Sequence, residues 1–211
     1  MKLAAVRIQG YRAHEDTTVT LENDLTVVVG RNNTGKTSFI EIIDKFIGNN
    51  KRNGIHATDF SAGQRRQLLD ALRCKSKKRN NNVSIPSITL TLIINYNLKD
   101  DTREDIASIA PYLTTLDTEC TTLEIECKYT PTNETYIKSI LTESTTKKSE
   151  KIEDKLLKLI EESGEYKTTY QARSTFADNT IKNTNEARIL TKEEVRAIVN
   201  TEYIYAQINL D

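Results

Sequence analysis

The sequence has 211 residues, enough for one sizeable domain or two small ones with a buried core. Its 30 basic and 30 acidic residues give zero formal net charge, so global electrostatics favours neither DNA nor a membrane as a partner. Three cysteines without C-x-x-C spacing and only two histidines argue against structural zinc and a disulfide framework. No apolar stretch reaches the length of a membrane span, and we expect a cytoplasmic protein with no membrane partner.

The predicted elements begin with alternating apolar and polar residues, which indicate strands over 2–13 and 15–23. The continuous apolar run DLTVVVG, residues 24–30, predicts a third strand. Residues 36–47 place their apolar side chains on one face at helical spacing, which predicts an amphipathic helix. A second helix is predicted from Ser61 to about Cys74.

The second half of the chain contains both strand-like and helix-like patterns. Residues 87–97 and 121–131 are rich in β-branched residues and predict strands that could pair antiparallel, with a helix between them inside 100–117. The charged stretch 134–173 is helix-prone and contains an amphipathic helix at 151–163. A short capped helix at 191–200 and a last strand at 201–211 complete the prediction.

One motif predicts a binding site for phosphate. Residues 30–37, GRNNTGKT, match G-x-x-x-x-G-K-[ST] at every position, between an apolar run and an amphipathic helix. In such a loop the backbone amides and the helix N-terminus hold phosphate, Lys36 reaches the β and γ oxygens, and Thr37 offers its hydroxyl to Mg²⁺. The sequence therefore predicts ATP and Mg²⁺ as ligands, with Lys36 as the catalytic residue. The predicted nucleotide-binding residues of the loop and helix are Asn32, Asn33, Thr34, Gly35, Lys36, Thr37 and Ser38.

Residues 1–43 resemble the opening of the ABC-type ATPase heads of Rad50, SMC and RecF proteins and of OLD-family nucleases. Those heads begin with a strand, an aromatic-Arg dipeptide, a second strand and the phosphate loop, and here the dipeptide is Tyr11-Arg12. The resemblance implies that Arg12 contacts phosphate or base; His14 would do the same or be a solvated turn residue. It also implies an α/β fold: the N-terminal portion of a P-loop ABC-type ATPase head with an antiparallel β lobe and a helical insertion.

A second stretch, FSAGQRR at residues 60–66, matches the ABC signature Leu-Ser-Gly-Gly-Gln at Ser61, Gly63 and Gln64. In the family the signature lies far from the phosphate loop and soon precedes a strand ending in Asp-Glu. Here it follows the loop closely, and no apolar run on a plausible strand ends in Asp-Glu. The residues Asp-Phe-Ser instead resemble a short element of OLD-family ATPases, and we expect Ser61 to be the N-cap of a helix.

Without the Asp-Glu pair the sequence supports nucleotide binding better than hydrolysis. The final residues IYAQINLD resemble a strand of OLD-family proteins, with Ile208 in place of an arginine. The matching positions are Ala206, Gln207, Leu210 and Asp211. This implies a single ATP-binding domain that is the N-terminal part of a larger head. Its expected parts are a P-loop core at 1–60, a basic helix with antiparallel strands at 61–133, a helical insertion at 134–200 and a returning strand at 201–211.

A basic cluster is the candidate DNA-contacting segment, because clustered cations can follow a phosphate backbone. Its members are Arg65, Arg66, Arg73, Lys75, Lys77, Lys78 and Arg79; a solvated helix and loop is the alternative interpretation. The resemblance implies an OLD-like ATPase whose full-length form couples nucleotide state to DNA nuclease activity in anti-phage defence. It would form a homodimer or higher oligomer through the head and work with a protein partner of the defence system. The alternatives are a Rad50-, RecF- or SMC-like repair ATPase head without nuclease activity, or a nucleotide-sensing module that does not hydrolyse.

Overall fold

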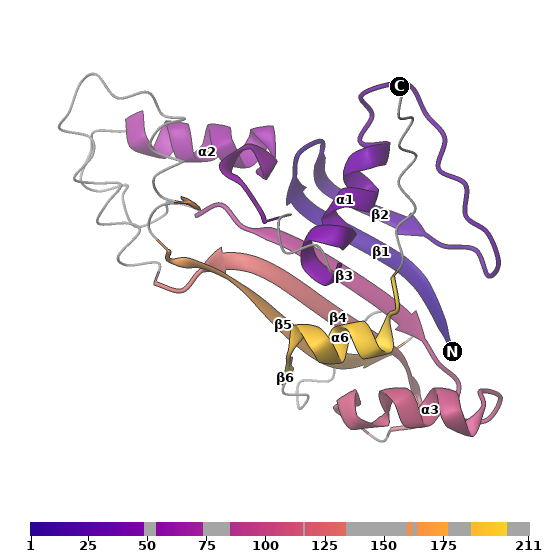
Figure 1. Cartoon of the computed structure of the whole chain (residues 1–211). Coiled ribbons are helices and arrows are strands. Elements are labelled where there is room, and N and C mark those ends of the chain that lie inside the picture. The colour runs from indigo at the N-terminus through magenta and orange to yellow at the C-terminus, as the bar shows by residue number, and fades with distance from the viewer. Residues whose placement is uncertain are drawn as a thin grey trace, which may run out of the picture.

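The computed structural model describes residues 1–48, 54–73, 85–115, 117–133, 160–161, 164–176 and 187–201, with side chains in the second range as far as residue 67. One antiparallel sheet of six strands, in the order β2-β1-β3-β4-β5-β6, organises these residues (Figure 1). The strands are β1 (Lys2–Tyr11), β2 (His14–Thr20), β3 (Ile88–Asn95), β4 (Cys120–Pro131), β5 (Tyr166–Phe176) and β6 (Arg188–Leu190).

The sheet buries one face of side chains in register. Val6 of β1 lies opposite Leu92 of β3, which lies opposite Ile125 of β4, which in turn lies opposite Ala172 of β5. All four side chains are at most 1% exposed. Because side chains alternate along a strand, this row fixes the inward face of four strands at once.

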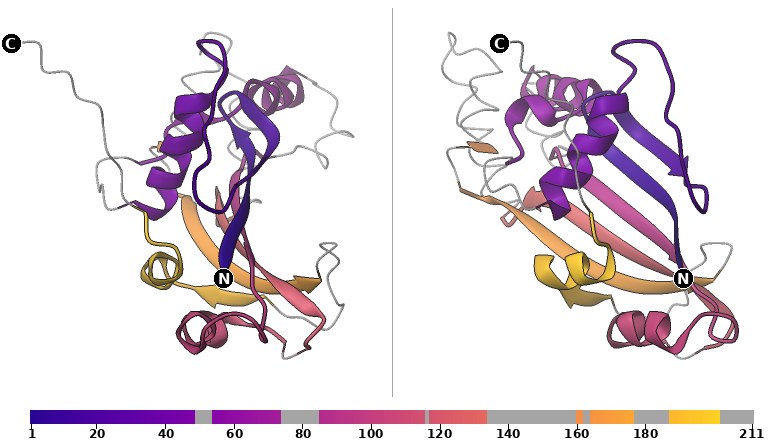
Figure 2. Two further views of the ribbon diagram at one scale, coloured as in Figure 1. Left: turned by 90° about the vertical axis from the view of Figure 1, so that its right-hand side faces the viewer. Right: turned by 45° about the vertical axis from the view of Figure 1, so that its right-hand side comes forward.

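Helices cover that apolar face. Helix α1 (Lys36–Ile47) buries Phe39, Ile42, Phe46 and Ile47 and contacts α6 (Lys192–Ile198), and the two lie on the same side of the sheet (Figure 2). Helix α3 (Arg103–Ile109) with the 3-10 turn η3 (Ala110–Tyr112) follows β3. The 3-10 turn η1 (Ala57–Asp59) leads into α2 (Ala62–Arg73), which lies near the end of the sheet where β1 turns into β2.

Most predicted elements are confirmed. The strands expected at 2–13, 15–23, 87–97 and 121–131 appear as β1, β2, β3 and β4, and the pairing of the last two is antiparallel. The helices expected at 36–47, from Ser61, inside 100–117 and at 191–200 also form. The predicted helix at 151–163 and the strand at 201–211 fall almost wholly outside the described residues.

The helix-prone assignment of 134–173 is wrong at its C-terminal end, because Tyr166–Phe176 forms strand β5. The stretch YKTTYQARSTF carries tyrosines, threonines and a phenylalanine, which suit a pleated, half-buried surface better than a helix. Full-length pairing with β4 then selects the strand. The short strand β6 was not predicted.

The strand predicted at 24–30 is also wrong. Residues 21–35 run as a long connection from β2 to α1, drawn as the extended loop in Figure 1. The exposed fractions of Leu25, Val27, Val28 and Val29 range from 42% to 83%. A continuous apolar run suits a strand buried on both faces. Within the part of the chain that the structure describes, this run has no strand to pair with.

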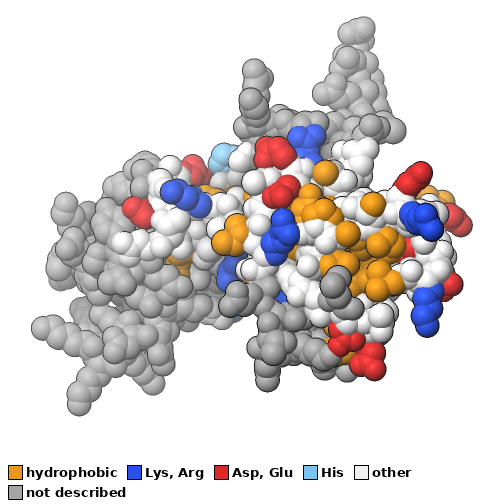
Figure 3. Space-filling view, turned by 90° about the horizontal axis from the view of Figure 1, so that it is seen from below, with side chains coloured by type: hydrophobic (Ala, Val, Ile, Leu, Met, Phe, Trp, Pro, Cys, Tyr) orange, Lys and Arg blue, Asp and Glu red, His pale blue; other side chains and the backbone are white. Residues whose placement is uncertain are grey.

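On the surface, hydrophobic side chains gather between charged ones on the face seen from below (Figure 3). Among the described residues, no helix has the length and apolarity that crossing a bilayer would need.

Candidate nucleotide-binding site

The phosphate loop ends where α1 begins. Asn33 and Gly35 have φ angles of 65° and 92°, the left-handed region, which glycine adopts without steric cost. Gly35 is the N-cap of α1; no side chain of the described residues caps the helix, and its first turn carries no acidic residue. The amides at this end therefore keep their partial positive charge for an anionic ligand.

Lys36 folds back over the loop. Its Nζ donates hydrogen bonds to the backbone carbonyls of Gly30 at 2.7 Å and Arg31 at 2.5 Å, and the Thr34 hydroxyl donates to the Arg31 carbonyl at 2.9 Å. Thr37 is exposed on the first turn of α1. The structure thus brings the predicted residues 32–38 together at one loop-helix junction, with the ammonium over the loop.

Arg12 occupies the two-residue turn between β1 and β2, with a φ of 47°. Its backbone amide donates to the Asp59 carbonyl at 2.7 Å, and its Nε donates to Asp59 Oδ1 at 2.9 Å. Its Nη1 donates to the Glu41 carboxylate, and the guanidinium lies 5.1 Å from the centre of the Tyr11 ring. Burial, reinforced by the charge of Asp59, raises the pKa of the Tyr11 hydroxyl. Arg12 is thus held by two carboxylates, and its contact with phosphate stays a prediction.

Asp59 is the centre of this cluster and is only 1% exposed. Its Oδ2 accepts from the His56 amide at 3.0 Å and lies 3.1 Å from Lys45 Nζ, whose side chain is 4% exposed. Lys45 also donates to the Gly54 carbonyl at 2.6 Å. A buried carboxylate thus ties the strand turn, α1 and η1 together.

The roles of Glu41 and Lys45 were not predicted from the sequence. Their spacing of four on a helix is typical of an exposed ion pair. In the structure they instead serve Arg12 and Asp59, which lie on other elements. The sequence marks this cluster only through Asp59-Phe60-Ser61, the stretch that resembles a short element of OLD-family ATPases.

His14 opens β2 and lies against the phosphate loop. Its side chain is buried, and its Nε2 is 3.0 Å from the carbonyl oxygen of Gly35. The interpretation of His14 as a solvated turn residue is therefore wrong, and its contact is with the backbone of the loop.

The family comparison agrees with this geometry. The family model described as "AAA ATPase domain" matches residues 1–209. The chain belongs to the AAA ATPase domain family. An ATPase domain implies ATP as a ligand, and the family supports the expected α/β ATPase region.

The chain is also similar to one curated relative and to one solved structure. The chain is 31% identical over 109 residues to the "DNA double-strand break repair Rad50 ATPase" of Sulfolobus acidocaldarius, a match that covers 51% of this chain and 11% of the relative. A solved structure described as "Structural biochemistry of ATP-driven dimerization and DNA stimulated activation of SMC ATPases" superposes with a TM-score of 0.43 at 10% identity, covering 94% of this chain and 77% of that one. The matched segment thus spans about half of this chain and about a tenth of the length of the Rad50 relative.

In the ATPase domain the signature-like residues hold α2 in place. The Ser61 hydroxyl, fully buried, donates to Glu15 Oε2 at 2.7 Å and accepts from the Gln64 amide at 3.4 Å. The Gly63 amide donates to Glu15 Oε1 at 2.7 Å. The N-terminus of α2 is therefore already capped by a carboxylate and a hydroxyl, which confirms Ser61 as an N-cap.

The Gln64 side chain is also held by hydrogen bonds within the fold. Its amide group donates to the Ser87 carbonyl at 2.7 Å and accepts from the Ser87 amide at 3.0 Å. Gly10, with a φ of 74°, makes room for it, because a Cβ at this position would lie 2.2 Å from Gln64 Nε2. The three matches to the signature thus have structural roles within this chain.

The basic cluster is described only in part. Arg65 is half-buried, with its Nε buried and unbonded among the described residues, and Arg66 is exposed. The side chains of Arg73, Lys75, Lys77, Lys78 and Arg79 lie outside the described part, so DNA contact stays a prediction.

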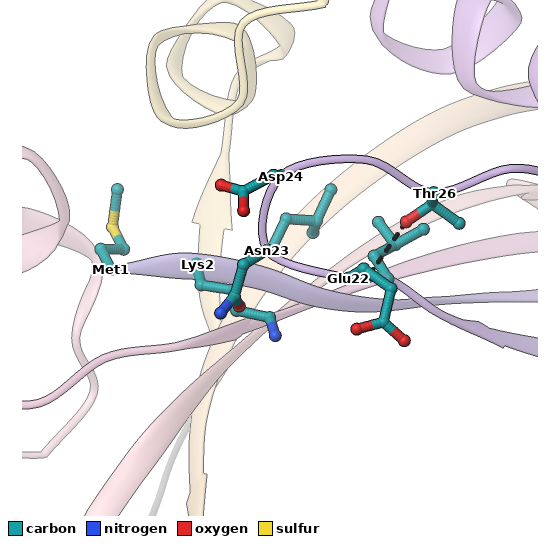
Figure 4. Close-up of a pocket in the computed structure, with 8 residues that line it drawn as sticks. Met1, Lys2, Glu22, Asn23, Asp24 and Thr26 are labelled. Carbon is teal, nitrogen blue, oxygen red and sulfur yellow. Dashed lines mark hydrogen bonds between the residues drawn. The ribbon is translucent and has the colours of Figure 1, made fainter.

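Two cysteines and a surface hollow lie outside the phosphate loop. Cys120 and Cys127 are buried, and burial raises the pKa of the Cys127 thiol to about 12. In the described residues, no group of three or more His, Cys, Asp or Glu side chains is arranged to hold a metal ion. A hollow of about 580 Å³ is lined by residues 1–3, 21–24 and 26 (Figure 4), and none of the phosphate-loop residues 30–37 lines it.

Proposed function

We propose that this ATPase domain binds Mg-ATP through residues 30–38. The observation that supports it best is a complete phosphate-loop consensus at the start of a helix. Its second glycine, Gly35, is the N-cap residue, and no side chain of the described residues caps the helix. Lys36 would exchange its two loop carbonyls for β and γ phosphate oxygens, so its ammonium would stay hydrogen-bonded and gain oppositely charged partners. Asn32, Asn33, Thr34, Gly35 and Ser38 would line the phosphates.

The residues also fit a magnesium ion. Thr37 offers an exposed hydroxyl at the start of α1, and Mg²⁺ takes its other ligands from phosphate oxygens and water. When bound, the ion would neutralise charge on the phosphates. Arg12 would add a second cation if its Nη1 exchanged Glu41 for phosphate while Nε stayed on Asp59.

For the full-length protein we propose an OLD-like ATPase that couples nucleotide state to a DNA nuclease in anti-phage defence. It would dimerise through its heads, contact DNA through the cluster around Arg65 and Arg66, and act with a protein partner. A Rad50-like repair head is the second candidate, and the Rad50 match favours it. The reading frame after Asp211 separates them: an acidic Toprim-type cluster supports the first, and a long heptad coiled coil supports the second.

The binding proposal is tested by titrating the chain with a fluorescent ATP analogue in the presence of Mg²⁺. We expect a micromolar dissociation constant for the natural chain and no measurable binding for Lys36→Ala. Lys99→Ala, which removes an exposed lysine far along the chain, is the matched control and should bind normally. An unchanged affinity in Lys36→Ala would overturn the proposal.

Turnover is a separate question. Because no apolar strand-like run in the sequence ends in the Asp-Glu pair that would supply a general base, we expect slow or absent steady-state hydrolysis by the 211 residues alone. Robust release of phosphate, lost in Lys36→Ala, would show that a catalytic carboxylate was missed.

A further inference from the structure

The His14 side chain contacts the backbone carbonyl of Gly35 in the phosphate loop. We infer that it is a positioning residue that orients the peptide between Gly35 and Lys36, and so aims the Lys36 amide at the bound phosphate. The inference rests on the proposed function, since it concerns how the same loop holds ATP. It gives His14 no contact with the nucleotide itself.

The histidine ring is packed directly on the loop. Besides the 3.0 Å contact of Nε2 with the Gly35 carbonyl, a Cβ built on Gly35 would lie 2.8 Å from Nε2 and 3.0 Å from Cε1. The side chain is 8% exposed. In the tautomer that carries hydrogen on Nε2, the ring donates to this carbonyl, which also accepts the first helical bond from the Phe39 amide at 2.9 Å. The Gly35 carbonyl is therefore held from two directions.

Holding that carbonyl also holds the next amide. The peptide bond is planar and trans, so the carbonyl of Gly35 and the N–H of Lys36 lie in one plane and point in opposite directions. Glycine at a φ of 92° has a wide range of backbone angles open to it, so this peptide would tilt easily if only the helical bond restrained it. The imidazole removes that freedom before the ligand arrives, and preorganised donors bind anions more tightly.

The imidazole is itself fixed by the sheet. His14 pairs with Tyr11 in the register of β1 and β2, and the turn between them is anchored by Arg12 on Asp59 and Glu41. A rigid hairpin end thus presents the ring to the loop. This arrangement is the reason for a buried polar side chain at the first position of an edge strand.

The test compares two amide side chains that differ by one methylene group. In His14→Gln the amide nitrogen reaches about as far from the backbone as Nε2 does, so the contact with Gly35 is kept. In His14→Asn it falls short, and the contact is lost. Loss of one hydrogen bond corresponds to an affinity decrease of about 3- to 10-fold, and we expect it in His14→Asn but less than about 2-fold in His14→Gln. If His14→Asn does not fold, His14→Phe, which keeps the ring without the donor, replaces it.

Binding is measured for both ATP and ADP by the fluorescence titration above. The Lys36 amide faces the β-phosphate, which both nucleotides carry, so the two affinities should fall by the same factor. Equal affinities for His14→Asn and the natural chain, or a His14→Gln affinity as low as that of His14→Asn, would overturn the inference. A natural chain that binds neither nucleotide would instead overturn the proposed function, so the two failures are distinct.

Discussion

Replacing Asp59 by asparagine should destabilise the fold far more than the same change at an exposed ion pair. The Asp59 and Lys45 side chains are only 2% and 4% exposed, so the neutral amide leaves a buried ammonium whose remaining partner among the described residues is the Gly54 carbonyl. Removing one member of a buried pair costs about 3 to 5 kcal/mol, because the other charge stays desolvated. That is a large fraction of the roughly 5 to 15 kcal/mol that stabilises a typical domain.

Asp16 provides the matched control. Its carboxylate pairs with Arg7 in good geometry, with Arg7 Nε 2.8 Å from Asp16 Oδ1, but the two side chains are 45% and 50% exposed. Asp16→Asn should therefore cost only about 0 to 1 kcal/mol. Urea denaturation followed by circular dichroism gives both values if the slope of the transition is unchanged. A loss at Asp59 no larger than that at Asp16 would refute the view that this carboxylate holds the turn, α1 and η1 together.

Two further predictions follow from buried side chains. Ser61→Ala should lower the free energy of unfolding by about 1 to 3 kcal/mol, because it removes a buried donor to Glu15, and should leave ATP affinity unchanged. The reverse pattern, lost ATP binding at unchanged stability, would restore the signature interpretation of residues 60–66. Because burial raises the Cys127 pKa to about 12, the thiol is protonated at pH 8, and iodoacetamide should modify Cys127 slowly until urea unfolds the chain. Peptide mass spectrometry measures this, and rapid labelling of the native chain would contradict the burial.

The parts of the fold that sequence predicted well are those in which local pattern and tertiary environment agree. Residues 36–47 have both helical spacing and a sheet face to cover, and the predicted and observed bounds coincide. Tyr166–Phe176 shows the opposite case. Its charged neighbours suggested a helix, but pairing along the whole of β4 decided the structure, and that partner is 35 residues earlier in the chain.

The candidate site also has a part that the sequence predicts and a part that it does not. The phosphate loop is continuous in sequence, so a motif finds it. The cluster of Arg12, Glu41, Lys45 and Asp59 joins the strand turn, α1 and η1. No spacing rule connects Arg12 or Asp59 with the two residues on α1. The same holds for Glu15, which caps a helix that begins 47 residues later. Contacts between distant elements depend on the folded topology, which a single sequence does not display.

The exposed valine run between β2 and α1 also bears on how the chain behaves at high concentration. Residues 25–29 combine high β-propensity with no charge and no proline, the composition of segments that pair between molecules. Charged side chains bracket the run, with Glu22 and Asp24 before it and Arg31 after it. Such flanking charges oppose the stacking of identical segments, so colloidal stability should depend on ionic strength through these three residues.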